Sequence, residues 1–359
     1  LIEKGKAYYC FCSPERLDQI RKAMQEKKEI PRYDRHCRAI VPEEAKKRVS
    51  DGEKYVVRMV IPDNEIIGWD DLVRGRIEFD SNVIDDQVIL KSDGFPTYHL
   101  AVVVDDYLMK ISHVLRGEEW ISSCPKHVLL YRYFGWELPE FAHMPLLRNK
   151  DKSKMSKRKN DVSIFSYKEK GYLPEALINY LSLMGWSHPE EKDIFSYEEY
   201  IKVFSIERMQ TTGPIFDIEK LNWMNQQYIQ NKTDNELKQI IVDFYPQANE
   251  LATETLDALI PLVKTRMQTL KEFAELTEVF FDAATTGEDT ELAHIVKEAF
   301  IAISDWNHAM IFEEMKKIME EKKIRMPVLY KLLIGKDRGL PLPQVLEILG
   351  KEKTLALLH

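Results

Sequence analysis

The segment from Ile111 to Leu147 constrains the fold of this chain more than any other stretch. Ile111 to Leu115 and Phe141 to Leu147 are short apolar runs typical of buried strands. Between them, Ser122-Ser123-Cys124-Pro125 is typical of a helix start and Gly135 of a helix end. A strand, a helix and a strand in this order predict a parallel pair with a right-handed crossover, which is half of a doubly wound α/β domain.

Another buried strand is predicted upstream, between Phe95 and Asp106. Val102 to Val104 is a β-branched run that ends in Asp105 and Asp106. We expect a parallel strand here with polar side chains at its carboxyl end, where open α/β sheets bind their ligands. Arg116, at the end of the next strand, is well placed to hold a carboxylate.

The N-terminal part of the chain also contains strand signals. Residues 6–11 alternate and are aromatic, which predicts a strand, and Ser13-Pro14-Glu15 then begins a charged helix. Three further strand-like runs, separated by turn residues, lie at 54–61, 77–80 and 87–90.

From Ser166 onward the composition turns helical. Pro174 begins a helix that Gly185 closes, and its predicted apolar face consists of Leu177, Ile178, Leu181 and Met184. Residues 216–225 are amphipathic, and after Thr233 there is almost no strand signal. Apolar side chains keep helical spacing there, at Leu256, Leu259, Ile260, Val263, Met267, Leu270, Val296, Phe300 and Ile303. The sequence therefore predicts an all-helical C-terminal domain.

Lys150 to Lys159 is strongly basic in an otherwise acidic chain. Six of its ten residues are cationic, whereas the formal net charge of the 359 residues is −8. Ser153 and Ser156 among the lysines indicate a surface loop, which could fold its ammonium groups around a polyphosphate. A solvated charge run is the alternative, and composition alone favours it. The position after a strand–helix–strand unit reverses that preference, with Lys157 as the expected phosphate contact and Lys154 second.

Bulk properties narrow the class of protein. A chain of this length predicts roughly two to four domains, and none of its apolar runs approaches the ~20 residues of a membrane span. The net charge argues against a general coat for nucleic acid, although a local basic groove stays open. Leu1 to Gly5 is typical of the last turn of a helix, so we expect the chain to begin inside a longer structure.

Four cysteines in a chain of this length do not form a disulfide framework, which favours the cytosol. Cys10, Cys12 and Cys37 have a spacing found in zinc sites, but zinc needs a fourth ligand. His36 adjoins Cys37, and Ala39 occupies the position two residues beyond it. We therefore assign no metal ligands, favour ordinary buried cysteines, and keep zinc open only if His36 completes the group.

Several segments in a common order resemble the class I glutamyl-tRNA synthetases of bacterial type. Lys154-Met155-Ser156-Lys157-Arg158 resembles the mobile KMSKS-type signature loop of that family, and residues 92–100 resemble its substrate strand. The resemblance continues at residues 103–106, 113–120, 125–127, 171–177 and 216–223. It covers the whole chain and is weakest toward the C-terminus.

The resemblance implies roles for individual residues. Tyr98 and Arg116 would contact the substrate glutamate, with the arginine pairing one of its carboxylates. Lys157 would bind the ATP phosphates and Lys154 would assist, so these two lysines are the expected catalytic residues. The residues implied at the ATP site are Glu119, Trp120, Leu146, Leu147, Met155, Ser156 and Lys157.

The implied reaction is ATP-dependent ligation of L-glutamate to tRNA(Glu) in protein synthesis. The glutamate carboxylate attacks the α-phosphate of ATP, which is bound with Mg²⁺, to give glutamyl-adenylate and pyrophosphate. The terminal ribose hydroxyl of the tRNA then takes the acyl group, and both steps depend on positioning and electrostatics. We expect L-glutamate, ATP and tRNA(Glu) as partners, no membrane contact, a monomer and a cytoplasmic location.

The implied fold class is α/β followed by all-α. Residues 1–96 would form an α+β connective insertion that binds the tRNA acceptor end, and residues 97–150 the second half of a Rossmann-like catalytic domain. Residues 151–232 would carry the signature loop and a stem-contact region. Residues 233–359 would form the helical anticodon-binding domain.

One departure from the family pattern affects the expected activity. The histidine-bearing HIGH-type turn of the family is not in the sequence, and the resemblance assigns it to a region before Leu1. We therefore expect no ATP–pyrophosphate exchange from this chain alone. Two alternatives stay open, namely a non-catalytic tRNA-binding module and a non-discriminating enzyme that also charges tRNA(Gln).

Overall fold

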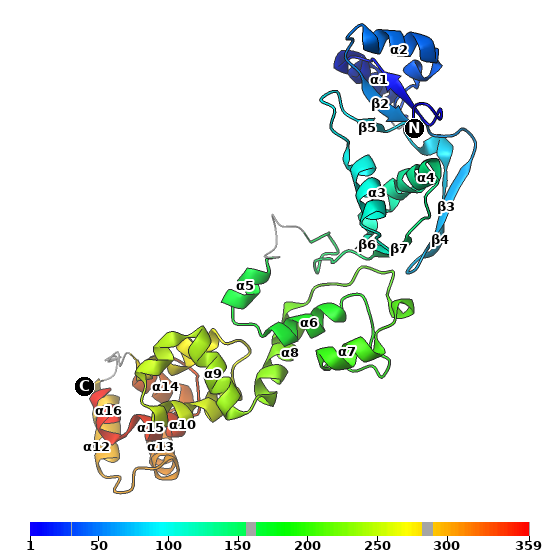
Figure 1. The fold of residues 1–359 in the computed structure, drawn as a ribbon. Coiled ribbons are helices and arrows are strands. Elements are labelled where there is room, and N and C mark those ends of the chain that lie inside the picture. Colours follow the sequence, from blue (N-terminus) through cyan, green and yellow to red (C-terminus); the bar gives the residue numbers. More distant parts are fainter. Residues whose placement is uncertain (30, 156–162, 282–289, 359) are drawn as a thin grey trace. The chain divides into compact units, whose positions relative to one another are not determined.

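The computed structural model describes residues 1–29, 31–155, 163–281 and 290–358 (Figure 1). The chain forms two compact units, each of which is described by itself. Unit 1 consists of Leu1–Arg148, Gly185–Ser187 and Phe204–Pro214. Unit 2 consists of Asn149–Met184, His188–Val203 and Ile215–His359.

Unit 1 contains two small sheets. The first is antiparallel, in the order β1 (Ala7–Cys10), β2 (Val56–Met59) and β5 (Val88–Leu90). The second has the order β4 (Gly75–Asp80), β3 (Ile66–Asp71), β7 (Glu140–Met144) and β6 (His113–Gly117). β3 and β4 pair as an antiparallel hairpin, whereas β3, β7 and β6 run parallel.

Helix α4 (Cys124–Phe134) connects β6 to β7, which confirms the predicted strand–helix–strand unit. Pro125 stands in its first turn, and Gly135 ends it with a φ of 76°, a left-handed conformation that glycine adopts without strain. The register sets Arg116 of β6 opposite His143 of β7. The carboxyl ends of the two strands therefore lie at one edge of the sheet.

The other predicted elements at the N-terminal end are confirmed as β1, β2, β4, β5 and the first helix. Ser13 caps that helix by accepting the N–H of Arg16 at 3.3 Å. This first helix is α1 (Pro14–Glu26), and unit 1 also contains α2 (Pro42–Ser50) and α3 (Tyr98–Leu108). Its 3-10 turns are η1 (His36–Ala39), η2 (Ser81–Val83), η3 (Glu118–Ser123) and η4 (Ile206–Arg208).

The predicted strand between Phe95 and Asp106 is wrong, because most of this segment is helix α3. Only Val103 of the valine run is fully buried. One face of a helix accounts for this pattern, whereas a strand covered on both sides would bury all three valines. A short apolar run does not distinguish the two structures. Asp105 consequently lies near the C-terminal end of a helix, not at the end of a strand.

Two further differences concern the second sheet. β3 has no counterpart among the predicted strands, although Ile67, Trp69 and Asp71 are buried in regular alternation along it. β6 is present, but its Leu115 is 57% exposed, so the prediction of a buried strand is wrong there.

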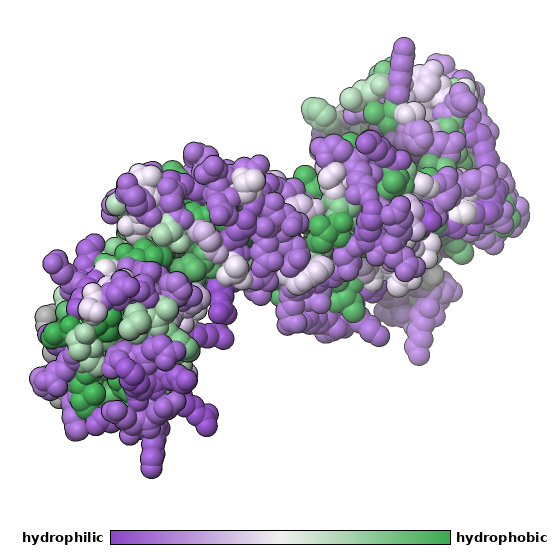
Figure 2. All heavy atoms as spheres, turned by 90° about the horizontal axis from the view of Figure 1, so that it is seen from below, coloured by the Kyte–Doolittle hydropathy of each residue, from purple (hydrophilic) through white to green (hydrophobic). Residues whose placement is uncertain are grey.

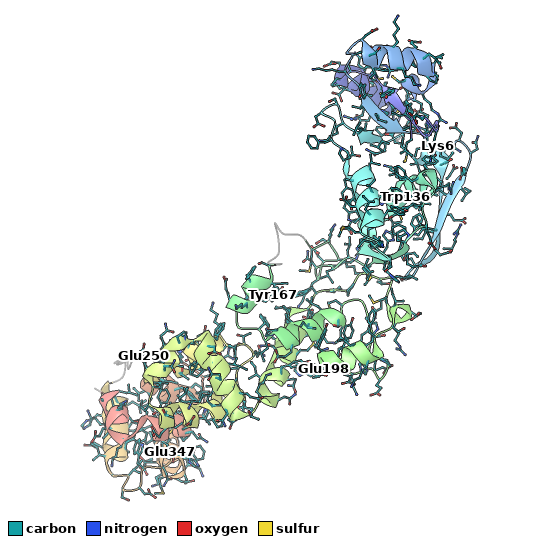
Figure 3. All side chains as sticks on the ribbon, in the orientation of Figure 1. Lys6, Trp136, Tyr167, Glu198, Glu250 and Glu347 are labelled. Carbon is teal, nitrogen blue, oxygen red and sulfur yellow. The ribbon has the colours of Figure 1, made fainter. Side chains whose placement is uncertain are left out.

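The core of unit 1 forms where α4 packs against the second sheet. Trp69 and Phe141 of the sheet and Leu129 of α4 belong to one buried cluster. Truncating such side chains to alanine costs about 2–5 kcal/mol of stability. Trp136, labelled in Figure 3, stacks on Tyr107 with ring centroids 3.9 Å apart and attaches the segment after α4 to the end of α3.

The described part of unit 2 contains helices and no strand. Its first helices are α5 (Ile164–Glu169), α6 (Pro174–Ser182), α7 (Tyr197–Val203) and α8 (Ile218–Asn231). They are followed by α9 (Asp234–Phe244), η5 (Pro246–Glu250), α10 (Thr253–Lys264), α11 (Glu272–Thr277), η6 (Glu278–Phe280), α12 (Thr290–Ile301), α13 (His308–Lys322), α14 (Met326–Ile334), α15 (Leu342–Leu349) and α16 (Lys351–Ala356). The predicted all-helical region after Thr233 is confirmed.

Helical spacing predicted the core of this region well, but not that of α6. The nine apolar side chains expected inside after Thr233 are all buried. On α6, however, Ile178 and Leu181 are exposed, whereas Asn179 and Tyr180 are buried. Asn179 accepts the N–H of Phe195 at 3.2 Å, so a polar side chain occupies the inner face that the pattern assigned to apolar ones.

The surface of the protein is largely hydrophilic, with apolar residues in scattered groups on the face that Figure 2 shows. In unit 2, ion pairs between α9 and α10 join Lys238 to Asp257 and Lys264 to Asp234. Such exposed pairs contribute about 0–1 kcal/mol each. Within the described ranges, every helix is too short or too polar to cross a bilayer.

Candidate active site

Arg116 is the central side chain of the candidate site in unit 1. It stands one residue before the end of β6, and its guanidinium has three separate environments. Nε donates to His143 Nε2 at 3.1 Å, and Nη1 donates to His127 Nδ1 at 3.1 Å. Nη2 is buried, yet it has no hydrogen-bond partner among the described residues. Two nitrogens therefore fix the plane of the guanidinium, and the donors of the third are left over.

Two aromatic side chains are linked to this guanidinium through His127. Tyr98 is the first residue of α3, and its ring lies 4.9 Å from that of Trp120 in η3, measured between centroids. The Tyr98 ring also lies 6.3 Å from that of His127, the histidine that contacts Arg116. Three residues that the sequence predicted for substrate and ATP contacts thus come together from three elements. Tyr98 is 49% exposed, which leaves its face open to a ligand.

Sequence reasoning missed the residues behind Arg116. His127 and His143 are buried, and His143 Nδ1 lies 2.5 Å from Asp71 Oδ2. His127 lay inside a segment of the family resemblance, which was the one signal that could have found it. No signal pairs Asp71 with His143, because the two are 72 residues apart and the strand that carries Asp71 was not predicted.

Burial controls the protonation of His127, His143 and Asp71. It is the main cause that lowers the pKa of His127 to about 3, and the nearby charge of Arg116 acts in the same direction. Burial also lowers the pKa of His143, although the hydrogen bond to Asp71 opposes this. Burial would raise the pKa of Asp71, but the hydrogen bonds from His143 outweigh it and the pKa is lowered. The group therefore holds neutral imidazoles and an ionised carboxylate.

Glu118 of η3 contacts the loop that follows β7. The Glu118 carboxylate pairs with Arg74 Nη2 at 2.5 Å and accepts the N–H of Leu146 at 3.4 Å. Leu146 and Leu147, which the sequence predicted at the ATP site, are half-buried in this loop. Glu119 is the next residue of η3 and is exposed.

Comparison with known proteins identifies the family. Residues 1–223 match the model described as the catalytic domain of class I tRNA synthetases (E and Q), and residues 226–359 match the model of an anticodon binding domain. A glutamate–tRNA ligase of Clostridioides difficile is 44% identical over 99% of this chain and 77% of its own length. The chain belongs to the class I glutamyl-tRNA synthetases.

Another relative and a solved structure agree with this assignment to the glutamyl-tRNA synthetases. A glutamate–tRNA ligase of Alkaliphilus metalliredigens is 39% identical over 98% of the chain and 76% of its own length. The crystal structure of a glutamate tRNA ligase from Elizabethkingia meningosepticum in complex with its amino acid has a TM-score of 0.83 and 32% identity. The match covers 99% of this chain and 79% of that one. The predicted fold class, an α/β catalytic part followed by a helical anticodon-binding part, is confirmed.

The segment that resembles the signature loop of the glutamyl-tRNA synthetases lies in unit 2 and is described only in part. Lys154 is exposed and Met155 is half-buried. Ser156, Lys157 and Arg158 lie outside the described residues. The roles of these five residues stay predictions from the sequence.

Three cysteines from two separate segments of the sequence come together in unit 1. The sulfurs of Cys10, Cys12 and Cys37 lie within 4.8 Å of one another. The Tyr33 hydroxyl is 3.4 Å from Cys10 Sγ and 3.3 Å from Cys12 Sγ. His36, the residue on which zinc binding depended in the sequence analysis, is exposed and does not belong to the group. Three thiols are the donors that zinc prefers, so the cluster fits this metal in ligand type.

Proposed function

We propose that this chain belongs to an enzyme that ligates L-glutamate to tRNA(Glu) with ATP, through glutamyl-adenylate. Membership in the glutamyl-tRNA synthetases supports the reaction class. The observation that carries the assignment to the described residues is the buried, unpartnered Nη2 of Arg116, which is linked to Tyr98 and Trp120 through His127.

Arg116 is the residue that binds the substrate carboxylate in this proposal. A guanidinium forms its strongest hydrogen bonds to carboxylates, and burial of Nη2 strengthens them because little water competes. The ring of Tyr98 covers one side of the amino acid, and Trp120 supports that ring. The site holds the glutamate so that its other carboxylate faces the α-phosphate of ATP.

Adenylate formation needs positioning and charge more than a protein nucleophile. The glutamate carboxylate forms a bond to the α-phosphate, and pyrophosphate leaves with the electron pair of the broken P–O bond. Lys157 and Lys154 of the signature loop stabilise the charge on the phosphates, and Mg²⁺ bound with ATP adds to this. Met155 and Ser156 complete the loop side of the ATP site, Glu119 and Trp120 line it, and Leu146 and Leu147 frame the adenine.

The second step transfers the glutamyl group to the tRNA, and it gives roles to the remaining parts of the chain. The terminal ribose hydroxyl of tRNA(Glu) attacks the acyl carbon, and AMP leaves. Residues 1–96 bind the acceptor end, 97–150 complete the catalytic domain, 151–232 contact the stem and 233–359 bind the anticodon. We expect a monomer in the cytoplasm.

The direct test is charging of purified tRNA(Glu) and tRNA(Gln) with labelled glutamate by the full-length protein that contains this chain. Glutamate on tRNA(Glu) alone supports the proposal as stated, and glutamate on both tRNAs identifies a non-discriminating enzyme. Binding of tRNA without charging would instead identify the protein as a non-catalytic tRNA-binding module.

Because His36 does not complete the cysteine cluster, ordinary buried cysteines stay the favoured interpretation, and we propose a structural zinc ion between β1 and η1 only with a fourth ligand other than His36. Cys10, Cys12 and Cys37 supply three thiolates, and the Tyr33 hydroxyl adjoins two of them. The hydrogen bond between Cys37 and Cys10 lowers the pKa of the Cys10 thiol and raises that of Cys37. If zinc is bound, metal analysis of the purified protein should find about one zinc per chain, and Cys37→Ser should remove it. If the purified wild-type protein contains no zinc, the three residues are ordinary buried cysteines.

A further inference from the structure

We propose that Asp71, His143 and His127 are positioning residues that hold the Arg116 guanidinium in one proton arrangement and leave its Nη2 and its charge to the substrate carboxylate. This inference rests on the proposed role of Arg116 in binding glutamate. The three residues come from β3, β7 and α4, and all three are buried.

The arginine determines the protonation of both histidines. A guanidinium only donates hydrogen bonds, so each histidine nitrogen that faces it must present a lone pair. His143 accepts through Nε2 and must therefore carry its proton on Nδ1, which faces Asp71 Oδ2 at 2.5 Å. His127 accepts through Nδ1 and carries its proton on Nε2, which donates to His99 Nδ1 at 3.0 Å. Both imidazoles are neutral, and each has a single tautomer.

Asp71 fixes the His143 tautomer from the other side. Its Oδ1 accepts the backbone N–H groups of Val73 and Arg74 at 3.1 Å each and that of His143 at 3.2 Å. Its Oδ2 is thus the oxygen that faces the imidazole. A carboxylate that accepts this many hydrogen bonds stays ionised.

This arrangement separates two opposite charges by a neutral ring. A carboxylate paired directly with Arg116 would occupy its nitrogens and compete with the substrate. Here the negative charge of Asp71 reaches Arg116 only through His143, so the guanidinium is oriented but not neutralised. None of the ion pairs among the described residues joins Arg116 to a carboxylate, and Nη2 stays unpartnered. The geometry of the network therefore suits a carboxylate-binding arginine.

The sharpest test is Asp71→Asn in the full-length protein. The three backbone N–H groups at Oδ1 hold the amide oxygen of the new side chain, so its NH₂ group faces His143 Nδ1. The proton of His143 then moves to Nε2, where it opposes the N–H of Arg116 Nε. Such a tautomer reversal, with the geometry otherwise intact, lowers the rate of a serine protease about 10⁴-fold.

We expect Asp71→Asn to raise the KM for glutamate at least about tenfold, because a charge-assisted hydrogen bond is lost. The KM for ATP should change less than about twofold. ¹⁵N spectra should show His143 protonated on Nδ1 in the wild type and on Nε2 in the variant. The control is Asp70→Asn, because Asp70 adjoins Asp71 in sequence but has a side chain that is 83% exposed.

A second pair of variants keeps the test valid if Asp71→Asn unfolds. His127→Leu removes the acceptor for Arg116 Nη1 and should raise the KM for glutamate about tenfold. His127→Asn restores an acceptor at the position of Nδ1 and should recover most of that loss. The control is His113→Leu, because His113 lies on the same strand as Arg116 and is exposed.

Two results would overturn the positioning role. One is a wild-type His143 that is protonated on Nε2 or on both nitrogens. The other is an unchanged KM for glutamate in Asp71→Asn and in His127→Leu. Because the tautomer is measured without substrate, these results are distinct from failure of the proposed function, which would appear as a wild-type protein that does not charge tRNA with glutamate.

Discussion

The two units of this chain use buried polar side chains in opposite ways. In unit 1, two nitrogens of Arg116 are held by histidines, and the third is buried without a partner among the described residues. In unit 2, the fully buried Asn225 uses both ends of its amide, accepting the N–H of Leu173 at 2.8 Å and donating to the carbonyl of Gln268 at 2.5 Å.

Whether its hydrogen bonds are complete distinguishes a buried polar group that binds a ligand from one that stabilises the fold. A buried polar group whose hydrogen bonds are complete stabilises the fold, and a ligand finds nothing to bind there. A buried donor without a partner costs stability, and that cost is recovered when a ligand binds. Loss of the binding group should therefore lower activity, whereas loss of the structural group should lower stability and leave activity unchanged.

The largest effect is expected for Arg116→Ala in the full-length protein. Removing one partner of a buried charge pair costs about 3–5 kcal/mol, so kcat/KM for glutamate should fall about 10²- to 10⁴-fold. The melting temperature should also fall, because the buried acceptors His143 Nε2 and His127 Nδ1 lose their donor. Arg76→Ala is the matched control, since Arg76 is an exposed arginine of β4. An equal loss of activity in both variants would contradict the assignment.

Asn225→Leu should lower the stability of the protein and leave its activity unchanged. The substitution leaves the N–H of Leu173 and the carbonyl of Gln268 buried without a partner, which costs about 2–4 kcal/mol of the free energy of unfolding. The KM for glutamate should stay within about twofold of the wild type. Denaturant unfolding measures the first effect and steady-state charging the second. Gln230→Leu on the exposed side of the same helix is the control.

The third prediction concerns the pH dependence of stability in unit 1. The pKa of His127 is about 3 in the folded chain, mainly through burial and then through the charges of Arg116, His99, Lys126 and His143. In the unfolded chain it is about 6.5. The unfolded state therefore binds more protons between these values, so the stability is present above about pH 6.5 and is lost as the pH falls toward 3.

Lowering the pH from 7 to 5 should accordingly reduce the free energy of unfolding by about 2 kcal/mol through His127 alone. His127→Asn should flatten the pH dependence over this range, whereas His113→Asn should leave it unchanged. Chemical denaturation at several pH values measures the slope. An identical slope in the wild type and in His127→Asn would show that this histidine does not control it.

The smallest effect is expected at the surface of unit 2. Lys238→Ala removes an exposed ion pair with Asp257 and should cost less than about 1 kcal/mol of stability. Charging of tRNA(Glu) should not change, because neither side chain belongs to the candidate site. A loss of several kcal/mol would mean that exposed ion pairs stabilise unit 2 as strongly as its buried amides do.

The sequence predicted the elements whose local signals were strong. Pro125 and Gly135 fix the bounds of α4, and the helical spacing of Leu256, Leu259 and their successors fixes the core of unit 2. The prediction from sequence was wrong at Val102 to Val104, since a short apolar run fits a helix as well as a strand. Local patterns carry no information on which distant residues meet.

The same limit applies to the candidate site. Arg116, Tyr98 and Trp120 were found from the sequence because their surroundings resemble a family. The groups that orient Arg116 were not, because hydrogen bonds between separate strands and helices depend on tertiary packing. The contact between Asp71 and His143 spans 72 residues and has no local signature.

The most direct test of the central claim is a crystal structure of the full-length protein with L-glutamate bound. The account predicts a glutamate carboxylate oxygen about 2.7–2.9 Å from Arg116 Nη2, with Nε and Nη1 still on His143 and His127. Glutamate bound elsewhere, with Nη2 facing only water, would contradict the role assigned to Arg116.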